Sequence, residues 1–347
     1  MKKRYISLSL LFVLFAIVAC ANHPINQKPT NEIFPVESTI VTAYMTEETF
    51  PVAEFAAQME QVVAGQSTDE LESSENATID PDTNPDSIQA LRVHFVDVGQ
   101  GNAVLIELAG KYMLVDGGDK NKKDTVASYL KSNDVQELEY VVATHPHADH
   151  IGGLPTVLRN FDVKKILMPD VQSQTLIFED LLYAIQDTDI GISIPALGDI
   201  FALGDAMITV VAPVREYGDN LNNASIGIRI DFHNTSFLLA GDAESASEQD
   251  MLSSIYDLQA DVFLANHHGS NTSNHEDFLR AISPSYVVIS VGAENTYGHP
   301  SVSVMERLDD LGITHYRTDE YGTIIASSDG NVISWNLEKT TTERKDS

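Results

Sequence analysis

The amino-acid sequence predicts an α/β domain with mixed β-sheets, which occupies residues 91–347 of the 347-residue chain. Apolar runs of strand length alternate with segments of helical periodicity, and some strands are joined by tight turns while others are joined through helices. The hydrophobic content of 43% is typical of a packed globular protein. The single cysteine excludes an intramolecular disulfide framework and a zinc site built from thiolates.

The first half of this domain is expected to begin with a strand and a hairpin. Ala109, Gly110 and Lys111 separate two apolar runs, as the turn of a hairpin does. The short run at 140–143 is wholly apolar before it reaches polar residues, which is typical of a buried strand. The predicted elements are strands at 91–98, 103–108, 112–115 and 140–143, and helices at 125–130 and 178–186.

The second half continues the mixture of strands and helices. Residues 226–232 alternate between apolar and polar side chains, which predicts a half-buried strand. Ser303 and Glu306 have the spacing of a helix capping box, and Gly312 predicts the end of the same helix. The other predicted elements are strands at 207–212, 237–240, 262–265 and 286–291, helices at 274–282 and 303–311, and a last hairpin of strands 323–326 and 332–335 across Asp329-Gly330.

The first 20 residues are typical of a secretory signal peptide. A basic start at residues 2–4 precedes an apolar run at 6–19, which is shorter than the about 20 apolar residues of a membrane-spanning helix. The run ends in Ile17-Val18-Ala19-Cys20, which resembles the lipobox of bacterial lipoproteins. That resemblance implies an extracytoplasmic lipoprotein, anchored to the bacterial cell membrane through lipid on Cys20. The alternatives are an uncleaved anchor, or a plain signal peptide in which Cys20 stands by chance.

Residues 21–90 are predicted to form an acidic, disordered tether. They contain 13 Asp and Glu and one Lys, a net charge of −12, and they show no sustained hydrophobic period. Residues 91–347 contain 38 Asp and Glu and 17 Lys and Arg, a net charge of −21. The total of −30 argues against a protein that coats DNA or RNA by bulk electrostatic attraction.

A cluster of metal-ligating side chains follows the predicted strand at 140–143. The sequence His145-Pro146-His147-Ala148-Asp149-His150 places three imidazoles and a carboxylate within six residues. Imidazole nitrogens and carboxylate oxygens suit zinc and other first-row divalent metal ions. We expect His145 and His147 to bind one ion, and Asp149 and His150 to bind a neighbouring one.

Two other predicted strands also end in candidate ligands. Asp242 follows the strand at 237–240, where its carboxylate is suited to bridge two ions, and His267 and His268 follow the strand at 262–265. Taken alone, an aspartate at a strand end is more often a turn former. Together with the 145–150 cluster, these strand ends predict one site for two divalent metal ions, Zn²⁺ or Mn²⁺.

The stretch 145–150 matches the HxHxDH motif of the metallo-β-lactamase superfamily, and the chain over about 91–338 resembles the extracytoplasmic hydrolase domain of the ComEC/Rec2 competence proteins. The resemblance implies an αββα sandwich, in which two mixed sheets are flanked by helices and the metals lie at one edge. The matching stretches are 97–101, 114–118, 222–225, 240–244, 267–270, 297–300 and 317–319.

The resemblance also implies roles for individual residues. His267 and His268 compete for one ligand position, and we favour His268, with His267 turned toward the substrate. The implied set is His145 and His147 for the first ion, Asp149 and His150 for the second, Asp242 as the bridging carboxylate, His268 as the last ligand, and Asp116 as a supporting residue beneath the 145–150 loop.

One departure concerns the first ion. Many members of the superfamily have another histidine between the HxHxDH motif and the bridging aspartate, whereas this chain has Asn222-Asn223-Ala224-Ser225 in that region. The first ion therefore has one imidazole fewer. More oxygen ligation makes Mn²⁺ plausible beside Zn²⁺.

These residues predict a metal-dependent hydrolase, and in the sharpest form a phosphodiesterase or nuclease that acts on extracellular DNA. Two ions lower the pKa of a bound water and stabilise both the attacking and the leaving oxygen, so the expected nucleophile is hydroxide held between them. The catalytic candidates are Asp149, His267 and His299. We expect His299 to donate a proton to the leaving group or to hold a phosphate oxygen, unless it only caps the helix near Ser303.

Polar groups near the predicted ligands are candidates for contacts with an anionic substrate oxygen. The backbone amides of Gly269 and Ser270, and the side-chain amide of Asn222 or Asn223, are suited to that role. Lys120, Lys122 and Lys123 follow the strand that ends near Asp116 and are either phosphate contacts or part of a solvated loop.

Two other functions fit the sequence. The net charge of −21 on residues 91–347 opposes the approach of a polyanion, whereas a small or wall-linked ester, such as a phosphorylcholine ester or a lactone, needs no basic groove. The third possibility is a non-catalytic surface receptor with a structural metal site, which would be closed rather than open. We infer no obligate protein partner, and the expected membrane contact is through the lipid anchor at Cys20.

Overall fold

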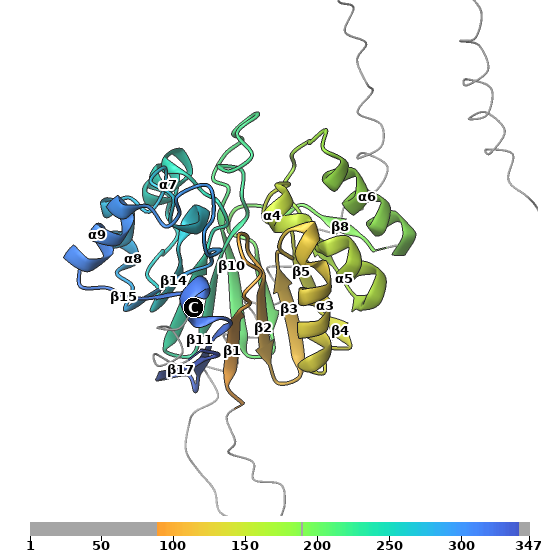
Figure 1. The fold of residues 1–347 in the computed structure, drawn as a ribbon, viewed down its shortest axis with the longest axis horizontal. Coiled ribbons are helices and arrows are strands. Elements are labelled where there is room, and N and C mark those ends of the chain that lie inside the picture. Colours follow the sequence, from red (N-terminus) through yellow and green to blue (C-terminus); the bar gives the residue numbers. More distant parts are fainter. Residues whose placement is uncertain (1–88, 189, 340–347) are drawn as a thin grey trace, which may run out of the picture. The chain divides into compact units, whose positions relative to one another are not determined.

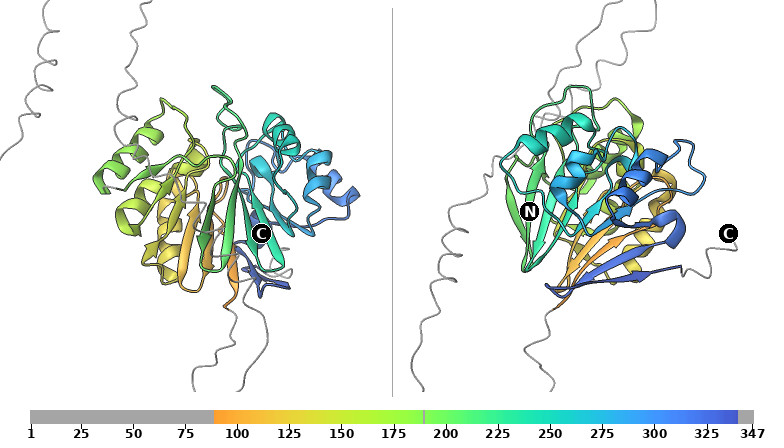
Figure 2. Two further views of the ribbon diagram at one scale, coloured as in Figure 1. Left: turned by 180° about the vertical axis from the view of Figure 1, so that it is seen from behind. Right: turned by 90° about the vertical axis from the view of Figure 1, so that its left-hand side faces the viewer.

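Two β-sheets pack face to face, and helices cover the outer face of each sheet (Figures 1 and 2). The computed structural model describes residues 89–188 and 190–339. The predicted signal peptide at 1–20, Cys20 and all but the last two residues of the predicted tether therefore lie outside the described residues. The layer order of helix, sheet, sheet and helix is the αββα sandwich that the sequence predicts, and the predicted fold class is confirmed.

The first sheet contains eight strands in the order β17-β16-β1-β2-β3-β5-β7-β8. Neighbours from β17 to β3 are antiparallel, whereas β3, β5, β7 and β8 are parallel. The predicted turn at Ala109 and Gly110 is confirmed, and both residues have the positive φ of a two-residue hairpin turn. The strands are β1 (Leu91–Phe95), β2 (Val104–Leu108), β3 (Lys111–Val115), β5 (Tyr140–Val142), β7 (Ile166–Leu167), β8 (Ile192–Ser193), β16 (Ile324–Ser328) and β17 (Ile333–Leu337).

The second sheet contains seven strands in the order β15-β14-β13-β12-β11-β10-β9. Its strands from β9 to β12 are antiparallel, and those from β12 to β15 are parallel. These strands are β9 (Ile200–Leu203), β10 (Ala206–Ala212), β11 (Gly227–Phe232), β12 (Thr235–Leu239), β13 (Val262–Leu264), β14 (Tyr286–Ile289) and β15 (Thr314–Arg317), and a separate pair is formed by β4 (Glu137–Leu138) and β6 (Asp162–Val163).

Helices on the outside complete the four layers. α3, α5 and α6 pack on the first sheet, and α7, α8 and α9 pack on the second (Figure 1). No helix in 89–188 or 190–339 is long and apolar enough to cross a membrane. The helices are α3 (Lys123–Ser132), α4 (Ala148–Ile151), α5 (Leu154–Asn160), α6 (Leu176–Thr188), α7 (Ser245–Ser253), α8 (Glu276–Ile282), α9 (Val302–Asp310) and α10 (Thr318–Tyr321), with 3₁₀ turns η2 (Lys120–Lys122) and η3 (Asn266–Gly269).

The central core lies between the inner faces of the two sheets. Val93 and Phe95 of β1 are buried together with Ile228 and Ile230 of β11 and with Phe237 of β12. Alternate side chains of β11 therefore point into this core, as the period of two in residues 226–232 predicts. Burial of this apolar surface provides the main favourable free energy that holds the sheets together.

The predicted capping box at the start of α9 is wrong. The helix begins at Val302, its N-cap residue is Ser301, and the Ser301 side chain makes no capping hydrogen bond. The backbone carbonyl of Ser301 instead accepts bonds from the amides of Val304 and Met305. Ser301 is the last residue with extended backbone, with φ −69° and ψ 146°, so the helix begins one residue before Ser303. The predicted end of the helix is confirmed, because Gly312 adopts a positive φ just after it.

His94 is a buried histidine far along the sequence from the predicted ligands. Its side chain is 1% exposed, and Nδ1 lies 2.8 Å from the Tyr129 hydroxyl of α3. Burial, together with the positive charge of Arg92, lowers the pKa of His94 to about 4. His94 is therefore neutral at pH 7, although Glu107 lies 3.6 Å from its Nε2 atom.

The lowered pKa of His94 predicts a loss of stability in acid. In the unfolded chain this histidine binds a proton near its ordinary pKa, so its contribution is complete above about pH 6.5 and is lost as the pH falls to about 4. The loss is roughly 3 kcal/mol at most. We expect His94→Asn, which keeps an acceptor for Tyr129, to lose less unfolding free energy between pH 7 and pH 4.5 in urea titrations. Equal losses in the variant and the wild type would contradict this assignment.

Candidate metal centre

Four strand ends from both sheets meet at one edge of the sandwich. Asp116 follows β3, the 145–150 stretch follows β5, Asp242 follows β12, and the pair at 267–268 follows β13. Because β3 and β5 are parallel, as are β12 and β13, their carboxyl ends share an edge. The Ile226 amide donates to the Thr144 carbonyl over 2.9 Å and joins the two sheets at this edge.

The predicted ligands form two groups around Asp242. The first contains His145, His147 and Asp242, and the second contains Asp149, His150 and His268; within each group the offered atoms lie within 4.8 Å of one another. Asp242 faces both groups. Its Oδ2 is 3.6 Å from Nε2 of His145, and its Oδ1 is 3.1 Å from Nε2 of His150 and 3.6 Å from Nε2 of His268. This is the position of a carboxylate shared by two ions.

The carboxylates of the centre stay ionised. Burial favours the neutral form of Asp242, but the imidazoles of His150, His268 and His145 hold its pKa well below the ordinary value. Asp149 behaves in the same way, because His150 and His268 outweigh its burial and lower its pKa. The centre therefore offers negative charge to a cation.

The donor set fits divalent metal ions. Nε2 of His150 and Oδ1 of Asp242 are buried and make no hydrogen bond, although they face each other. Buried polar atoms without a partner are rare, and a metal ion would satisfy both of them. Nitrogen from imidazole with oxygen from carboxylate is the combination that first-row divalent ions prefer.

A second layer of hydrogen bonds orients the imidazoles. Asp116 accepts from the Thr144 hydroxyl and backbone amide, and its Oδ2 lies 2.7 Å from Nδ1 of His150. Nδ1 of His268 donates to the Ser290 carbonyl over 2.9 Å. In both histidines the outer nitrogen is thereby fixed and Nε2 is left facing the centre, as in metal-ligating histidines generally. Asp116 occupies the supporting position beneath the 145–150 loop.

Two neighbouring histidines occupy different environments. His268 is 2% exposed and belongs to the second ligand group, whereas the His267 side chain is 22% exposed and lies at the rim. Nε2 of His267 is 3.7 Å from Oδ2 of Asp242. Both residues have positive φ angles, of 50° and 54°, which are strained in residues other than glycine. Nε2 of His268 is 3.6 Å from Oδ1 of the same carboxylate, so the two rings approach Asp242 at different oxygens.

A buried glutamate holds this strained loop. Glu248 of α7 is 1% exposed and accepts bonds from the side chain of Asn266, the backbone amides of Asn274 and His275, and Nδ1 of His275. The Asn274 side chain in turn bonds to the backbone amide and carbonyl of Asn266. Sequence reasoning assigned no role to Glu248. Glu248 lies in a helix 18 residues before Asn266, and nothing in the local sequence pattern links the two, so its role follows only from the packing of α7 against the loop.

His299 lies at the rim and does not cap α9. Its ring centroid is 5.5 Å from that of His267 and 6.5 Å from that of His268. Burial and these two neighbouring imidazoles lower the pKa of His299 to about 4. At neutral pH its ring is uncharged, which suits the role of a hydrogen-bond donor to a phosphate oxygen better than that of a proton donor.

Three other groups that were predicted to contact a substrate oxygen make hydrogen bonds within the protein. The side-chain oxygen of Asn223 accepts the backbone amides of Glu244 and Ser247, and so holds the start of α7. The Ser270 amide donates to the His267 carbonyl, so it is not free for a substrate oxygen. The Asn222 amide donates to Glu244, a carboxylate that also lies 3.5 Å from Nδ1 of His267 and that sequence reasoning did not single out.

The lysines after β3 differ in their surroundings. Lys120 is paired with Asp180 over 3.5 Å, whereas the end of the Lys122 side chain packs against Gly99. The 99–102 loop is joined to the second ligand group, because the Asn102 amide donates to the Asp149 carbonyl. Lys122 therefore lies beside a loop that is bonded to Asp149.

A family profile described as "Metallo-beta-lactamase superfamily" matches residues 96–293, which include every residue of both ligand groups. The chain belongs to the metallo-β-lactamase superfamily. The match covers more than half of the chain, and the predicted family is confirmed.

Curated relatives include proteins named for the ComE operon, for competence and for recombination. ComE operon protein 3 of Bacillus subtilis is 26% identical over 250 residues, covering 67% of this chain and 32% of the relative. Competence protein ComA of Neisseria gonorrhoeae is 27% identical over 247 residues, covering 70% and 33%. Recombination protein 2 of Haemophilus influenzae is 29% identical over 222 residues, covering 62% and 26%. The chain thus spans about a third of the length of these relatives or less, and the predicted resemblance to the ComEC/Rec2 branch is confirmed.

Solved structures of the superfamily are also similar. YhfI of Bacillus subtilis has a TM-score of 0.46 and 11% identity, covering 71% of this chain and 100% of that one. Igni18 of Ignicoccus hospitalis has a TM-score of 0.46 and 17% identity, covering 67% and 98%.

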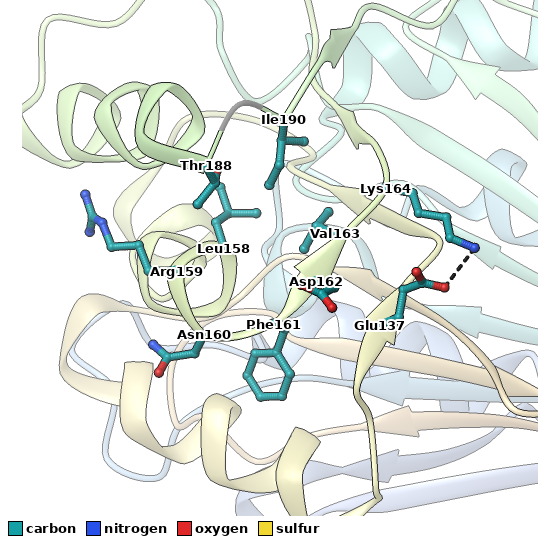
Figure 3. A pocket seen from close by; sticks show the side chains of 10 residues that line it. All are labelled: Glu137, Leu158, Arg159, Asn160, Phe161, Asp162, Val163, Lys164, Thr188 and Ile190. Carbon is teal, nitrogen blue, oxygen red and sulfur yellow. Dashed lines mark ion pairs between the residues drawn. The ribbon is translucent and has the colours of Figure 1, made fainter. Parts of the chain in front are cut away.

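A surface groove of the domain shares no lining residue with the two ligand groups. It is formed mainly by the end of α5 and by the residues of and around β6, and the ion pair between Lys164 and Glu137 lies at one side of it (Figure 3). None of the predicted site residues lines this groove. It therefore does not enter the account of the metal centre.

The Glu248 network predicts that this residue supports metal binding. In Glu248→Gln an amide N–H₂ group replaces one of two oxygens that each accept two donors, so at least one buried donor loses its partner. We expect metal affinity to fall about 10- to 100-fold and the free energy of unfolding to fall by about 1–3 kcal/mol. Chelator competition and urea unfolding measure the two effects.

The matched control is Glu276→Gln, because Glu276 is an exposed glutamate of α8 that pairs with Arg280. We expect this variant to keep the metal affinity of the wild type. Unchanged metal affinity in Glu248→Gln would show that the loop holds its histidines without the buried carboxylate.

Proposed function

We propose that this chain is an extracytoplasmic, metal-dependent phosphodiesterase that cleaves DNA. The observation that carries the proposal is that Asp242 is shared between two ligand groups whose outer side is open. His145, His150 and His268 are buried, whereas the Asp149 side chain is 29% exposed and that of His267 is 22% exposed. A catalytic metal site keeps an open position, and a structural site does not. This favours an enzyme over a receptor with a structural metal site.

Two sets of predicted residues would hold the two metal ions, and other groups orient the histidines among them. His145, His147 and Asp242 would hold one ion, and Asp149, His150 and His268, with Asp242, would hold the other. When bound, two divalent ions lower the pKa of water and stabilise charge on the attacking and leaving oxygens. Asp116 fixes the ring of His150 through a 2.7 Å contact, and the Ser290 carbonyl fixes that of His268.

The open side carries groups that suit a phosphodiester. His267 and His299 line it, and the neutral ring of His299 can donate a hydrogen bond to a nonbridging oxygen. Lys122 packs against Gly99, in the loop that is bonded to Asp149, and is the candidate cation for a phosphate of the bound strand. The net charge of −21 on residues 91–347 opposes long DNA in general, so a local cation and the metal ions have to attract the phosphate.

The relatives favour DNA over a small ester. Two of those that match this domain are named for competence operons or competence, and a third is named for recombination. Competence and recombination both act on DNA. The chain corresponds to about a third of the length of these relatives or less.

Metal-dependent turnover tests the proposed reaction. We expect bis-p-nitrophenyl phosphate and single-stranded DNA to be hydrolysed with Mn²⁺ or Zn²⁺, and we expect activity to disappear with chelator. Asp149→Asn should lower kcat/KM at least about 100-fold, because it removes a ligand and a negative charge from the centre. The control is Asp187→Asn, an exposed position on α6. Hydrolysis of lactones or phosphorylcholine esters, with no diesterase activity, would instead support the small-ester alternative.

We also propose that the protein is held at the membrane by lipid on Cys20. The support is the sequence before Cys20, because this cysteine lies outside the described residues. In a bacterial host we expect the wild type to partition into the membrane and Cys20→Ser to fail to do so. Detergent partitioning of both forms measures the effect. Equal partitioning would contradict lipid attachment at this residue.

A further inference from the structure

Three rings form a stack that leads from the metal centre to solvent. The ring of His268, in the second ligand group, lies 6.5 Å from that of His299 with an interplanar angle of 28°. The ring of His299 lies 5.8 Å from that of Tyr297 with an angle of 24°. The innermost ring is buried, the middle one is partly buried, and the Tyr297 side chain is the outermost. The stack therefore ends on a tyrosine at the mouth of the centre.

The loop that carries the two outer rings is held in one conformation. The side chain of Asn295 accepts the backbone amides of Tyr297 and His299, and it donates to the carbonyls of Gly292 and His299. The Ser301 amide donates to the Gly269 carbonyl and ties this loop to the one that carries His268. The position of Tyr297 relative to the ligands is thus fixed before any substrate binds.

Tyr297 itself contributes little to the folded state. It is 69% exposed, and its ring contacts in the described residues are with His299 alone. Its hydroxyl makes no hydrogen bond recorded among these residues, in contrast to the hydroxyl of the exposed Tyr183, which donates to Glu179. A large ring held by a rigid loop, with one face open beside a metal centre, is suited to receive a planar group.

The planar group that fits a phosphodiesterase is an unpaired nucleobase. Base stacking on an aromatic side chain is sequence-tolerant, because every base has a π-face, and it requires that the base not be covered by neighbours in a duplex. A quaternary ammonium group such as choline also binds aromatic faces. Such a cation is better held by several aromatic rings, whereas here the neighbouring rings are stacked and present one open face.

We propose that Tyr297 is a stacking subsite for an unpaired base of the strand whose phosphodiester lies at the two ligand groups. This inference rests on the proposed function and specifies its substrate as single-stranded DNA. The rings of His299 and Tyr297 then place the base at a fixed distance from the centre. Neither the binding of phosphate by Lys122 nor the binding of metal requires this subsite.

Oligonucleotides that differ only in their bases test the subsite. The probes are a labelled single-stranded deoxythymidine oligomer, an abasic oligomer of equal length and charge, and a duplex, all with phosphorothioate linkages that resist hydrolysis, and the protein is the metal-loaded chain. We expect the wild type to bind the deoxythymidine oligomer about tenfold or more tightly than the abasic oligomer in fluorescence anisotropy. Tyr297→Ala should abolish this difference, and Tyr297→Phe should keep it. Tyr183→Ala, which removes an exposed tyrosine of α6, is the matched control and should also keep it.

The outcomes separate this inference from the proposed function. Equal affinity of the wild type for the two oligomers, or a preference that survives in Tyr297→Ala, would overturn the subsite even if bis-p-nitrophenyl phosphate is hydrolysed. Tighter binding of duplex than of single strand, or Tyr297-dependent binding of phosphorylcholine without base preference, would also overturn it. A base preference that depends on Tyr297, in a protein that hydrolyses no diester, would support the subsite and refute the hydrolase.

Discussion

The centre depends on an ionised carboxylate, that of Asp242, held where two sheets meet and almost completely excluded from water. A buried charge is costly unless other charges or hydrogen bonds compensate it. In the described part of the chain, the ion pairs of Asp242 are all with histidines, which lie in the segments after β5 and β13. The strands of both sheets must therefore end at the same edge. The mixed topology provides this, because the parallel strands of each sheet direct their carboxyl ends to it.

A second constraint follows from the first. His267 and His268 both bring Nε2 to Asp242 from adjacent positions, and both adopt the left-handed backbone that costs residues other than glycine about 1 kcal/mol or more each. Glu248 and Asn274 offset this cost with hydrogen bonds to the surrounding loop. The helix α7 that carries Glu248 thus has two tasks: it covers the second sheet, and it supports the loop. The same edge also carries Asn295, which fixes the loop of His299 and Tyr297.

The sequence predicted the fold class and the convergence of strand ends because both depend on short patterns. Apolar runs followed by His145, Asp242 or His268 are visible without knowledge of tertiary contacts, and the periodicity of residues 226–232 gave the inner face of β11. The capping residue of α9 lies two positions before the predicted Ser303. The spacing of Ser303 and Glu306 indicates side chains that can form a capping box, but it does not contain the backbone angles that decide where the helix begins. Asn223 and Ser270 were assigned to substrate contacts because their types suit them. Their hydrogen bonds to the start of α7 and to His267 depend on how distant segments pack, which local patterns do not contain.

Anomalous scattering from crystals grown with Mn²⁺ tests the central claim most directly. If Asp242 is the carboxylate shared by two ligand groups, the anomalous difference map should contain two peaks, one beside His145 and His147 and one beside Asp149, His150 and His268. Asp242 should lie between them. An absence of density beside Asp242 in crystals that take up Mn²⁺ at other positions would contradict the account, because the buried carboxylate would then be compensated by the histidines alone.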